Sequence, residues 1–258
     1  MSAPVLAATG LIKSFGGVRA VDDVTFVVKA GERVALIGPN GAGKTTCFNL
    51  VNGQLAPDAG TVLFEGSRID GLAPHVIARL GVGRTFQVAA TFASMTVREN
   101  VMLAMLGRAR QDGRLSMSAM RPAIAAADAV LQRVHCGELA TRHCATLAYG
   151  DAKRVELALA LAGSPRLLLM DEPTAGMAPD SRAALMEIAS DIAQKDGIAV
   201  LFTEHDMDVV FGFADRILVL DRGHLIAAGT PDEVRANPRV QVVYLGTNTQ
   251  AEQASIPR

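Results

Sequence analysis

The sequence of 258 residues lacks several features that mark particular classes of protein. It contains no tryptophan, two tyrosines and only three cysteines, Cys47, Cys136 and Cys144. Three cysteines without framework spacing exclude a disulfide scaffold and are typical of a reducing compartment. Lysine plus arginine number 25 against 26 for aspartate plus glutamate, giving a net charge of −1. There is therefore no basic surplus of the kind that proteins binding nucleic acid carry, and we expect no nucleic-acid partner.

Long hydrophobic runs are also missing, although half of the residues are apolar. No stretch approaches the roughly 18 consecutive apolar residues of a transmembrane helix. The first ten residues, MSAPVLAATG, have neither the basic nor the long apolar part of a secretory signal. We therefore expect a cytosolic protein with a sizeable core, which would act at a membrane only as a peripheral subunit.

A His-Cys pair occurs twice, at residues 135–136 and 143–144. Zinc ligands are usually paired two to five residues apart, and no such pair flanks these residues. We interpret all four as ordinary helix residues and expect no metal site there.

The pattern of apolar residues predicts an α/β fold with one helical insertion. Strands are expected at residues 18–29, 33–37, 61–64, 167–170, 198–203 and 217–220. Strands that alternate with helices imply a mainly parallel sheet. From about residue 89 to 146 alanine, leucine, methionine and arginine replace the β-branched residues, which predicts an inserted helical subdomain. It includes a helix over 123–134 with Pro122 in its first turn, whereas residues 247–258 are polar and read as a flexible tail.

The strongest motif follows the strand expected at residues 33–37. It matches the pattern G-x-x-x-x-G-K-[ST] and consists of Gly38, Pro39, Asn40, Gly41, Ala42, Gly43, Lys44, Thr45 and Thr46. Glycines let backbone N–H groups converge on a phosphate, and the helix that follows adds the positive end of its dipole. Lys44 then reaches the β- and γ-phosphates, and the Thr45 hydroxyl is placed for Mg²⁺. The motif predicts binding of a nucleoside triphosphate.

A second acidic motif ends the apolar run at residues 167–170. Asp171 and Glu172 follow directly, at the end of a strand expected to be buried in the sheet. Asp171 is placed to hold Mg²⁺ through water, and Glu172 to orient the attacking water or act as general base.

Together these motifs and the shorter ones around them resemble the ATP-binding subunits of ABC transporters over nearly the whole chain. Residues 84–87, Arg-Thr-Phe-Gln, look like the Q-loop, and residues 203–206, Thr-Glu-His-Asp, look like the switch-histidine segment. The resemblance implies that Gln87 meets Mg²⁺ or water at the γ-phosphate and that His205 hydrogen-bonds this phosphate. It also implies that Phe15 stacks on adenine, the alternative for Phe15 being plain packing in the core.

The resemblance also implies a fold and an assembly. The fold is a P-loop NTPase, RecA-like core with an N-terminal antiparallel β-subdomain. Residues 1–246 would form one ATPase domain, with a core of 1–88 and 163–246 and an inserted helical subdomain of about 89–162. In this family a signature segment caps the ATP held by the other subunit of a head-to-tail dimer. The matching residues here are Leu147, Ala148, Tyr149, Gly150 and Asp151.

The signature departs from the common Leu-Ser-Gly-Gly-Gln at three positions, since Ala148, Tyr149 and Asp151 replace serine, glycine and glutamine. We expect the backbone N–H groups and the helix over 151–162 to retain ATP binding, with slower turnover at that site. Asp151 has two readings: a favourable charge in the first helical turn, or a charge that weakens the facing site. Lys153 and Arg154 favour the first reading. Ala178 stands where the family often has aspartate, which puts cross-dimer communication through that carboxylate in doubt.

Several stretches together resemble one subgroup, the ATPase subunits of bacterial importers of branched-chain (hydrophobic) amino acids. They are Leu-Ala-Tyr-Gly at residues 147–150, Arg-Thr-Phe-Gln at 84–87 followed by Met-Thr-Val-Arg-Glu-Asn at 95–100, Glu-His-Asp-Met at 204–207 and Val-Tyr-Leu-Gly at 243–246. The resemblance implies MgATP hydrolysis at the cytoplasmic face of the cell membrane, with a paralogous ATPase subunit or a second copy, two permeases and an extracytoplasmic binding protein. Importers of urea, amides or aromatic acids, and a lipopolysaccharide exporter, are alternatives. A soluble ABC-type ATPase is a more remote alternative, because the chain has one cassette and an insert of ordinary composition. A P-loop kinase is also remote, because a kinase would need a phosphate-acceptor site but neither the signature nor the switch histidine.

Overall fold

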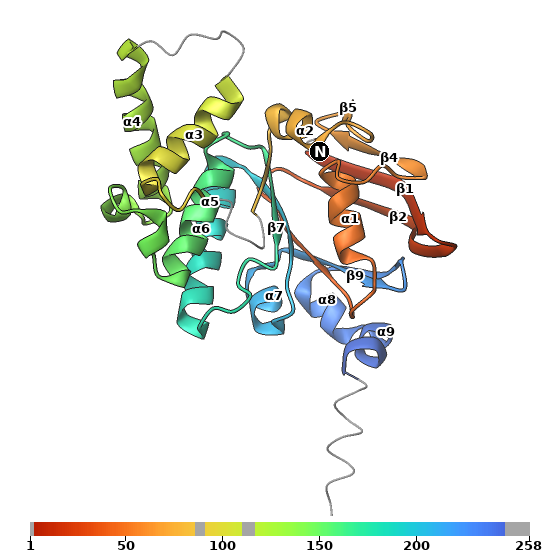
Figure 1. Cartoon of the computed structure of the whole chain (residues 1–258). Helices are drawn as coiled ribbons and strands as arrows, with labels where there is room; N and C mark the ends of the chain where they lie inside the picture. The colour runs from red at the N-terminus through yellow and green to blue at the C-terminus, as the bar shows by residue number, and fades with distance from the viewer. Residues whose placement is uncertain (1–2, 86–90, 110–116, 246–258) are drawn as a thin grey trace, which may run out of the picture.

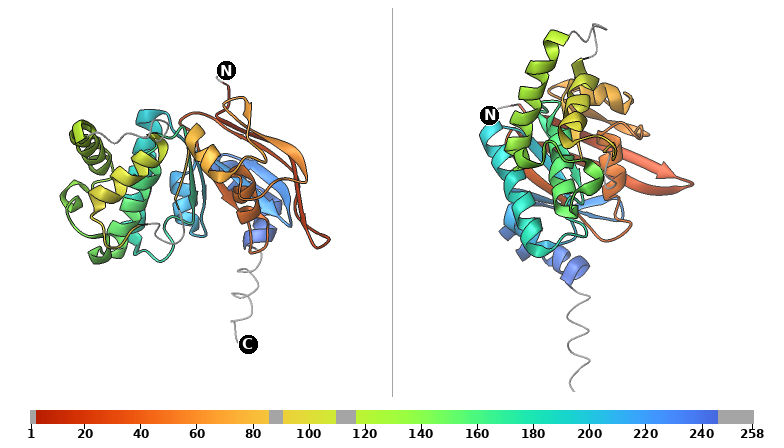
Figure 2. Two further views of the ribbon diagram at one scale, coloured as in Figure 1. Left: turned by 45° about the horizontal axis from the view of Figure 1, so that its top comes forward. Right: turned by 60° about the vertical axis from the view of Figure 1, so that its left-hand side comes forward.

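The computed structural model describes residues 3–85, 91–109 and 117–245. The tail expected at residues 247–258 therefore lies outside the described residues. Within the described residues the chain forms two β-sheets and a group of helices (Figure 1). Both Figure 1 and the left view of Figure 2 place helices α3 and α4 at one end of the molecule and the N-terminal strands at the other.

The first sheet is antiparallel and has the strand order β2-β1-β4-β5. Its strands are β1 (Leu6–Phe15), β2 (Val18–Val28), β4 (Ala59–Phe64) and β5 (Ser67–Arg68). The predicted N-terminal antiparallel sheet is thus confirmed, although the sequence analysis gave β1 and β5 no bounds. Strand β4 begins two residues before the strand expected at 61–64, because Ala59 already pairs with Ile12 of β1.

The second sheet has the order β10-β9-β3-β8-β7-β6, and every pairing except that of β10 with β9 is parallel. Its strands are β3 (Arg33–Ile37), β6 (Val82–Arg84), β7 (Leu167–Asp171), β8 (Ala199–Thr203), β9 (Arg216–Asp221) and β10 (His224–Gly229). The predicted mainly parallel sheet is confirmed. Strands β7 and β8 are buried along their whole length, which explains their nearly continuous apolar sequences.

The core consists of two clusters of buried side chains. Residues along a central strand belong alternately to one cluster and to the other. Along β3, Val34 and Leu36 join one cluster, and Ala35 and Ile37 join the other. This alternation arises because neighbouring side chains of a strand point to opposite faces of the sheet. The carboxyl ends of β3, β7 and β8 therefore lie at one edge of a sheet that is fixed from both faces.

Three of the helices, α3, α4 and α5, contact one another and lie within residues 89–162, for which a helical subdomain is predicted. The helices are α1 (Lys44–Val51), α2 (Pro74–Leu80), α3 (Val97–Ala109), α4 (Met117–Arg133), α5 (Tyr149–Leu161), α6 (Pro179–Asp196), α7 (Met207–Phe213), α8 (Pro231–Ala236) and α9 (Pro238–Val240), followed by a π-helical turn at Gln241–Leu245.

Two predictions about the helices are wrong. Pro122 lies inside α4 rather than in its first turn, because the helix already begins at Met117 among good helix formers. The repeated His-Cys pairs are not in regular α-helix. His135 has a left-handed backbone (φ 54°) in the turn after α4, and Cys144 begins a short 3₁₀ turn (Cys144–Thr146).

Candidate functional site

The glycine-rich loop between β3 and α1 is shaped by contacts that only glycine tolerates. A Cβ atom on Gly38 would lie 2.4 Å from the Leu220 carbonyl oxygen. Gly43 has a φ of 103°, and a Cβ atom there would lie 2.3 Å from the Ala20 carbonyl oxygen. Glycine adopts the Gly43 angle without strain, and at both positions the missing side chain lets the loop pass close to a carbonyl oxygen ahead of α1. The loop is a backbone cradle of the kind that holds phosphate groups.

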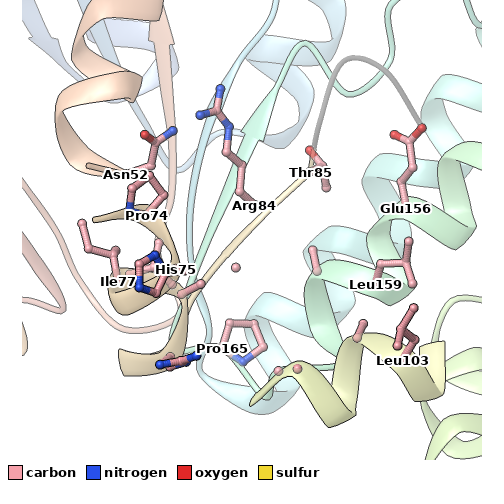
Figure 3. A pocket seen from close by; sticks show the side chains of 18 of the residues that line it. Asn52, Pro74, His75, Ile77, Arg84, Thr85, Leu103, Glu156, Leu159 and Pro165 are labelled. Carbon is pink, nitrogen blue, oxygen red and sulfur yellow. The ribbon is translucent and has the colours of Figure 1, made fainter. Parts of the chain in front are cut away.

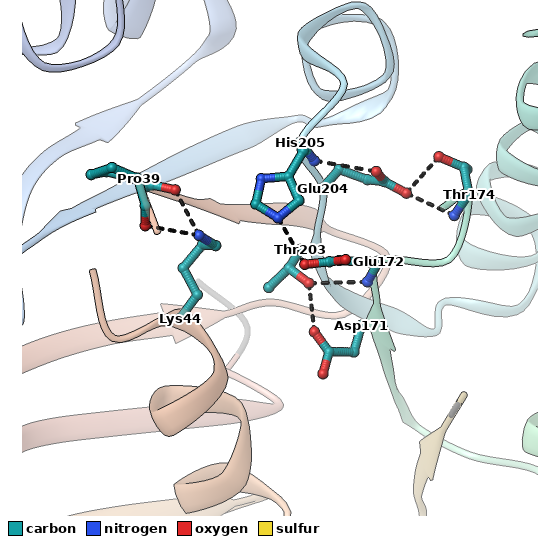
Figure 4. Close-up of polar contacts among 9 residues, drawn as sticks. Pro39, Lys44, Asp171, Glu172, Thr174, Thr203, Glu204 and His205 are labelled. Carbon is teal, nitrogen blue, oxygen red and sulfur yellow. Dashed lines mark hydrogen bonds and ion pairs between the residues drawn. The ribbon is translucent and has the colours of Figure 1, made fainter. Parts of the chain in front are cut away.

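Lys44, the first residue of α1, turns its side chain back into this loop. Its Nζ donates hydrogen bonds to the carbonyl oxygens of Gly38 (2.6 Å) and Pro39 (3.1 Å), and the residue is buried (Figure 4). Burial lowers the pKa of Lys44, while the charges of Glu172 and Asp171 act in the opposite direction. The loop thus holds a cation whose charge interacts with two carboxylates, those of Glu172 and Asp171.

Asp171, the last residue of β7, is buried and held on both of its carboxylate oxygens. Thr203, at the end of the neighbouring strand β8, donates its hydroxyl to Oδ1 at 2.7 Å. Arg84, at the end of β6, lies 3.3 Å from Oδ2. Burial lowers the pKa of Arg84, and Asp171 acts against this shift. These contacts fix the orientation of the carboxylate at the edge of the sheet.

Glu172 follows in a left-handed backbone conformation, with a φ of 48°. Its N–H donates to both the carbonyl oxygen and the hydroxyl oxygen of Thr203, at 3.1 Å each. Its carboxylate Oε1 lies 2.8 Å from Nε2 of His205, which follows the end of β8 (Figure 4). Strained backbone angles of this kind are concentrated at functional sites. The strand turns sharply here and presents the carboxylate beside the imidazole.

Thr203 and Glu204, to which the sequence analysis gave no role of their own, hold this arrangement in place. Glu204 is buried, and its Oε1 accepts hydrogen bonds from the N–H (2.8 Å) and the hydroxyl (2.7 Å) of Thr174. The other oxygen accepts the N–H of His205 at 3.3 Å. Glu204 therefore joins the segment after β7 to the segment after β8. In the sequence, only its place between Thr203 and His205 pointed to Glu204. A buried carboxylate needs hydrogen-bond donors, and Thr174 and His205 supply them.

The signature residues lie at the start of α5, which begins at Tyr149, two residues earlier than predicted. The Tyr149 hydroxyl donates to the Ala175 carbonyl oxygen at 2.8 Å. Asp151 forms an ion pair with Arg154 at 2.5 Å, whereas Lys153 pairs with Glu156 at 3.0 Å. Of the two cations that the sequence analysis considered, Lys153 and Arg154, only Arg154 pairs with Asp151. This geometry supports the favourable first-turn reading of that carboxylate.

Phe15 ends β1 in the antiparallel sheet and is 47% exposed. This exposure excludes the plain core role that was its alternative, and stacking on adenine stays a prediction. Gln87 lies outside the described residues. The structure thus brings Lys44, Asp171, Glu172 and His205 to one site, to which the signature is joined through Tyr149, while Phe15 stands on the other sheet.

A groove of about 470 Å³ lies beside this site, between α2 on one side and α3 and α5 on the other (Figure 3). Arg84 and Thr85 line it where β6 ends, and Glu156 faces it from α5. Burial raises the pKa of Glu156, which the hydrogen bond and charge of Lys153 oppose. The exposed side chains of Phe92 and Leu103 also line the groove. It is an apolar surface with a buried ion pair at its wall.

Two properties of the described part of the chain bear on what the site binds. None of its helices combines the length and the apolar character needed to cross a bilayer. It also contains no group of three or more histidine, cysteine, aspartate or glutamate side chains that could hold a metal ion, the two His-Cys pairs included. The predicted Mg²⁺ ligands, Asp171 through water, the Thr45 hydroxyl and Gln87, are oxygen donors of the hard kind that Mg²⁺ prefers.

Comparison with known proteins identifies the family. A family model described as ABC transporter matches residues 21–175, more than half of the chain. A second, described as branched-chain amino acid ATP-binding cassette transporter, matches residues 224–248. The chain is 41% identical to the high-affinity branched-chain amino acid transport ATP-binding protein LivG of Salmonella typhimurium, over 95% of this chain and 99% of the relative.

One further relative and one solved structure are also similar to this chain. The lipopolysaccharide export system ATP-binding protein LptB of Escherichia coli is 36% identical over 93% of this chain and 97% of its own length. The crystal structure of the ADP conformation of an ATP-binding cassette of an ABC transporter superposes with a TM-score of 0.84 at 30% identity, covering 95% of this chain and 100% of the other. The chain therefore belongs to the ABC transporter family, as one of its ATP-binding, ATP-hydrolysing cassettes.

Proposed function

We propose that this cassette drives a bacterial importer of branched-chain amino acids. The observation that carries the proposal is the match of residues 224–248 to the branched-chain transporter model, which the LivG likeness over nearly the whole chain supports. The LptB likeness, at lower identity, keeps lipopolysaccharide export as the alternative. No residue of the described site selects a transported substrate, since a fold and its ATPase site serve many cargoes.

In the proposed reaction the loop at residues 38–46 cradles the phosphates of ATP, and Lys44 neutralises charge on the β- and γ-phosphates. Thr45, Asp171 (through water) and Gln87 would hold Mg²⁺, which when bound would neutralise part of the phosphate charge. Glu172 orients the attacking water and accepts its proton. His205, 2.8 Å from Glu172, is the group that hydrogen-bonds the γ-phosphate. Phe15 stacks on the adenine.

The proposed assembly is a head-to-tail pair of cassettes at the cytoplasmic face of the cell membrane. Residues 147–151 would cap the ATP of the facing chain, a paralogous subunit or a second copy, through the N-terminus of α5. Residues 1–246 act as one ATPase domain with the helical insert of about 89–162. Two permeases complete the transporter, and the apolar groove beside α2, α3 and α5 is the surface that we assign to them. An extracytoplasmic binding protein delivers the substrate.

The ATPase roles are tested by two substitutions in the full chain. Lys44→Ala should abolish MgATP hydrolysis, because the β- and γ-phosphates lose their lysine. Glu172→Gln should bind MgATP but hydrolyse it slowly, and should elute as a dimer in gel filtration. An active Lys44→Ala variant, or a Glu172→Gln variant that stays monomeric in saturating MgATP both alone and mixed with the paralogous ATPase subunit, contradicts the assignment.

The transported substrate is tested in the source cell. Uptake of radiolabelled leucine should be lost in cells whose only copy of this cassette carries Lys44→Ala. Cells with the wild-type cassette should retain it. Retained leucine uptake in the Lys44→Ala strain would reject the proposal. Loss of urea, amide or aromatic-acid uptake in its place, or a defect in surface lipopolysaccharide, would identify the corresponding alternative.

A further inference from the structure

Tyr149 is a large, exposed side chain that is nevertheless anchored. It is 54% exposed, yet its hydroxyl donates a 2.8 Å hydrogen bond to the Ala175 carbonyl oxygen. It is also the first residue of α5, whose N-cap, Ala148, makes no side-chain hydrogen bond. The start of this helix is thus not held by a capping side chain. Tyr149 instead links it to the segment after β7.

The Tyr149 ring packs against Gly176 in the segment that follows β7. Gly176 has a φ of 76°, and a Cβ atom there would lie 3.4 Å from the Tyr149 hydroxyl and 3.7 Å from its ring. A Cβ atom at position 176 would thus be in ordinary van der Waals contact with the tyrosine, but the left-handed backbone would strain any larger residue. On the helix itself, Nζ of Lys153 lies 5.7 Å from the ring centroid, within the range of a cation–π contact.

The hydrogen bond reaches the segment close to Glu172. The N–H of Ala175 donates to the carbonyl oxygen of Glu172 at 3.2 Å. Both backbone polar groups of Ala175, its N–H and its carbonyl oxygen, are therefore hydrogen-bonded. The carboxylate of Glu172 in turn contacts His205. Two hydrogen bonds thus connect the side chain of Tyr149 to the backbone of the residue that we assign as general base.

We propose that Tyr149 is a positioning residue that couples the signature segment to Glu172 within the same chain. The proposal deepens the assigned ATPase mechanism and rests on it. A movement of α5 is transmitted through the tyrosine hydroxyl to the turn at Ala175, and from there to the backbone of Glu172. Ala178 offers no carboxylate to a facing chain, whereas this contact lies within one chain. A glycine at position 149 would offer no such hydroxyl.

The experiment compares Tyr149→Phe with Thr146→Val in the full chain, assembled with its transporter subunits. Both changes remove one hydroxyl that donates to a backbone carbonyl, since the Thr146 hydroxyl donates to His143 at 2.9 Å. Only the Tyr149 bond leaves the helical insertion. We expect Tyr149→Phe to lower kcat for MgATP about three- to tenfold, with KM changed less than twofold. Thr146→Val should leave both values unchanged.

A purely structural role for Tyr149 would give a different result. It would lower the thermal midpoint of Tyr149→Phe and leave kcat within about 1.5-fold of wild type, and this outcome overturns the proposal. An equal loss of kcat in Thr146→Val would overturn it as well, because the effect would then come from loosening the helical insertion.

A double-mutant cycle tests whether Tyr149 acts through Glu172. In the Glu172→Gln background, single-turnover hydrolysis should slow by less than 1.5-fold when Tyr149→Phe is added. If the two changes multiply, the coupling is refuted. If Glu172→Gln hydrolyses MgATP as fast as wild type, the general-base assignment fails instead, so the two failures are distinguishable.

Discussion

Replacing Thr203 by valine tests how the two acidic residues of the site are held. Thr203 is 1% exposed, and its hydroxyl donates to Asp171 at 2.7 Å and accepts the N–H of Glu172 at 3.1 Å. Valine has a similar shape and fills nearly the same volume. The change therefore removes one polar atom from a packed site with little rearrangement of its neighbours.

The expected loss follows from the partners that remain. The N–H of Glu172 keeps its bond to the Thr203 carbonyl oxygen, so the main loss is the bond to the Asp171 carboxylate. A hydrogen bond to a charged group contributes about 1.5–3 kcal/mol. In a domain of this size each kcal/mol shifts the thermal midpoint by roughly 2–4 °C, so we expect Tm to fall by roughly 3–12 °C. With Asp171 freer to turn, kcat should fall at least about tenfold.

Differential scanning calorimetry and steady-state MgATP hydrolysis measure both quantities, with Thr203→Ser as the matched control. Serine keeps the hydroxyl and loses one buried methyl group, which costs about 0.5–1.5 kcal/mol. Thr203→Ser should therefore lose stability but keep kcat within about threefold of wild type. The reasoning is refuted if Thr203→Val retains the wild-type Tm and kcat, or if serine impairs hydrolysis as much as valine does.

Three further changes follow from other contacts. Asp151→Gln should change turnover less than tenfold, since Arg154 neutralises that carboxylate; a larger gain in steady-state hydrolysis would favour the charge-weakening reading. Asn100→Ala should lower the unfolding free energy by about 1–3 kcal/mol in urea titrations, because the N–H of Phe92 loses its 2.7 Å acceptor. Burial raises the pKa of Asp215, but hydrogen bonds and charge from Arg33 outweigh it and leave this pKa low. Asp215→Asn should therefore be less stable than wild type at pH 7, by a gap that closes as pH falls below about 4; a constant gap would contradict this.

The parts of the fold that the sequence predicted are those with strong local patterns. The strand before Gly38 and the apolar run before Asp171 are buried on both faces, so their composition alone marks them as central strands. Motif spacing then placed Lys44 at the start of the helix that follows β3 and Glu172 directly after β7, at the same edge of the sheet.

The missed features depend on contacts between distant segments. Thr203 and Glu204 resemble ordinary strand-end residues until the sheet order places β8 beside β7. The hydroxyl of Tyr149 finds its acceptor 26 residues along the chain, and no local pattern encodes that distance. Strand β10 was missed because it lies at the edge of its sheet and is only partly buried, so its sequence lacks a continuous apolar run.

The left-handed backbone of Glu172 sets a limit on attempts to make this protein more robust. A non-glycine residue held at a φ of 48° costs of order 1–3 kcal/mol, and asparagine tolerates this conformation better than glutamate does. A directed-evolution screen that selects only for heat resistance would therefore accept asparagine at position 172 and lose the carboxylate. Stabilised variants of this cassette need to be screened for phosphate release as well as for survival at high temperature.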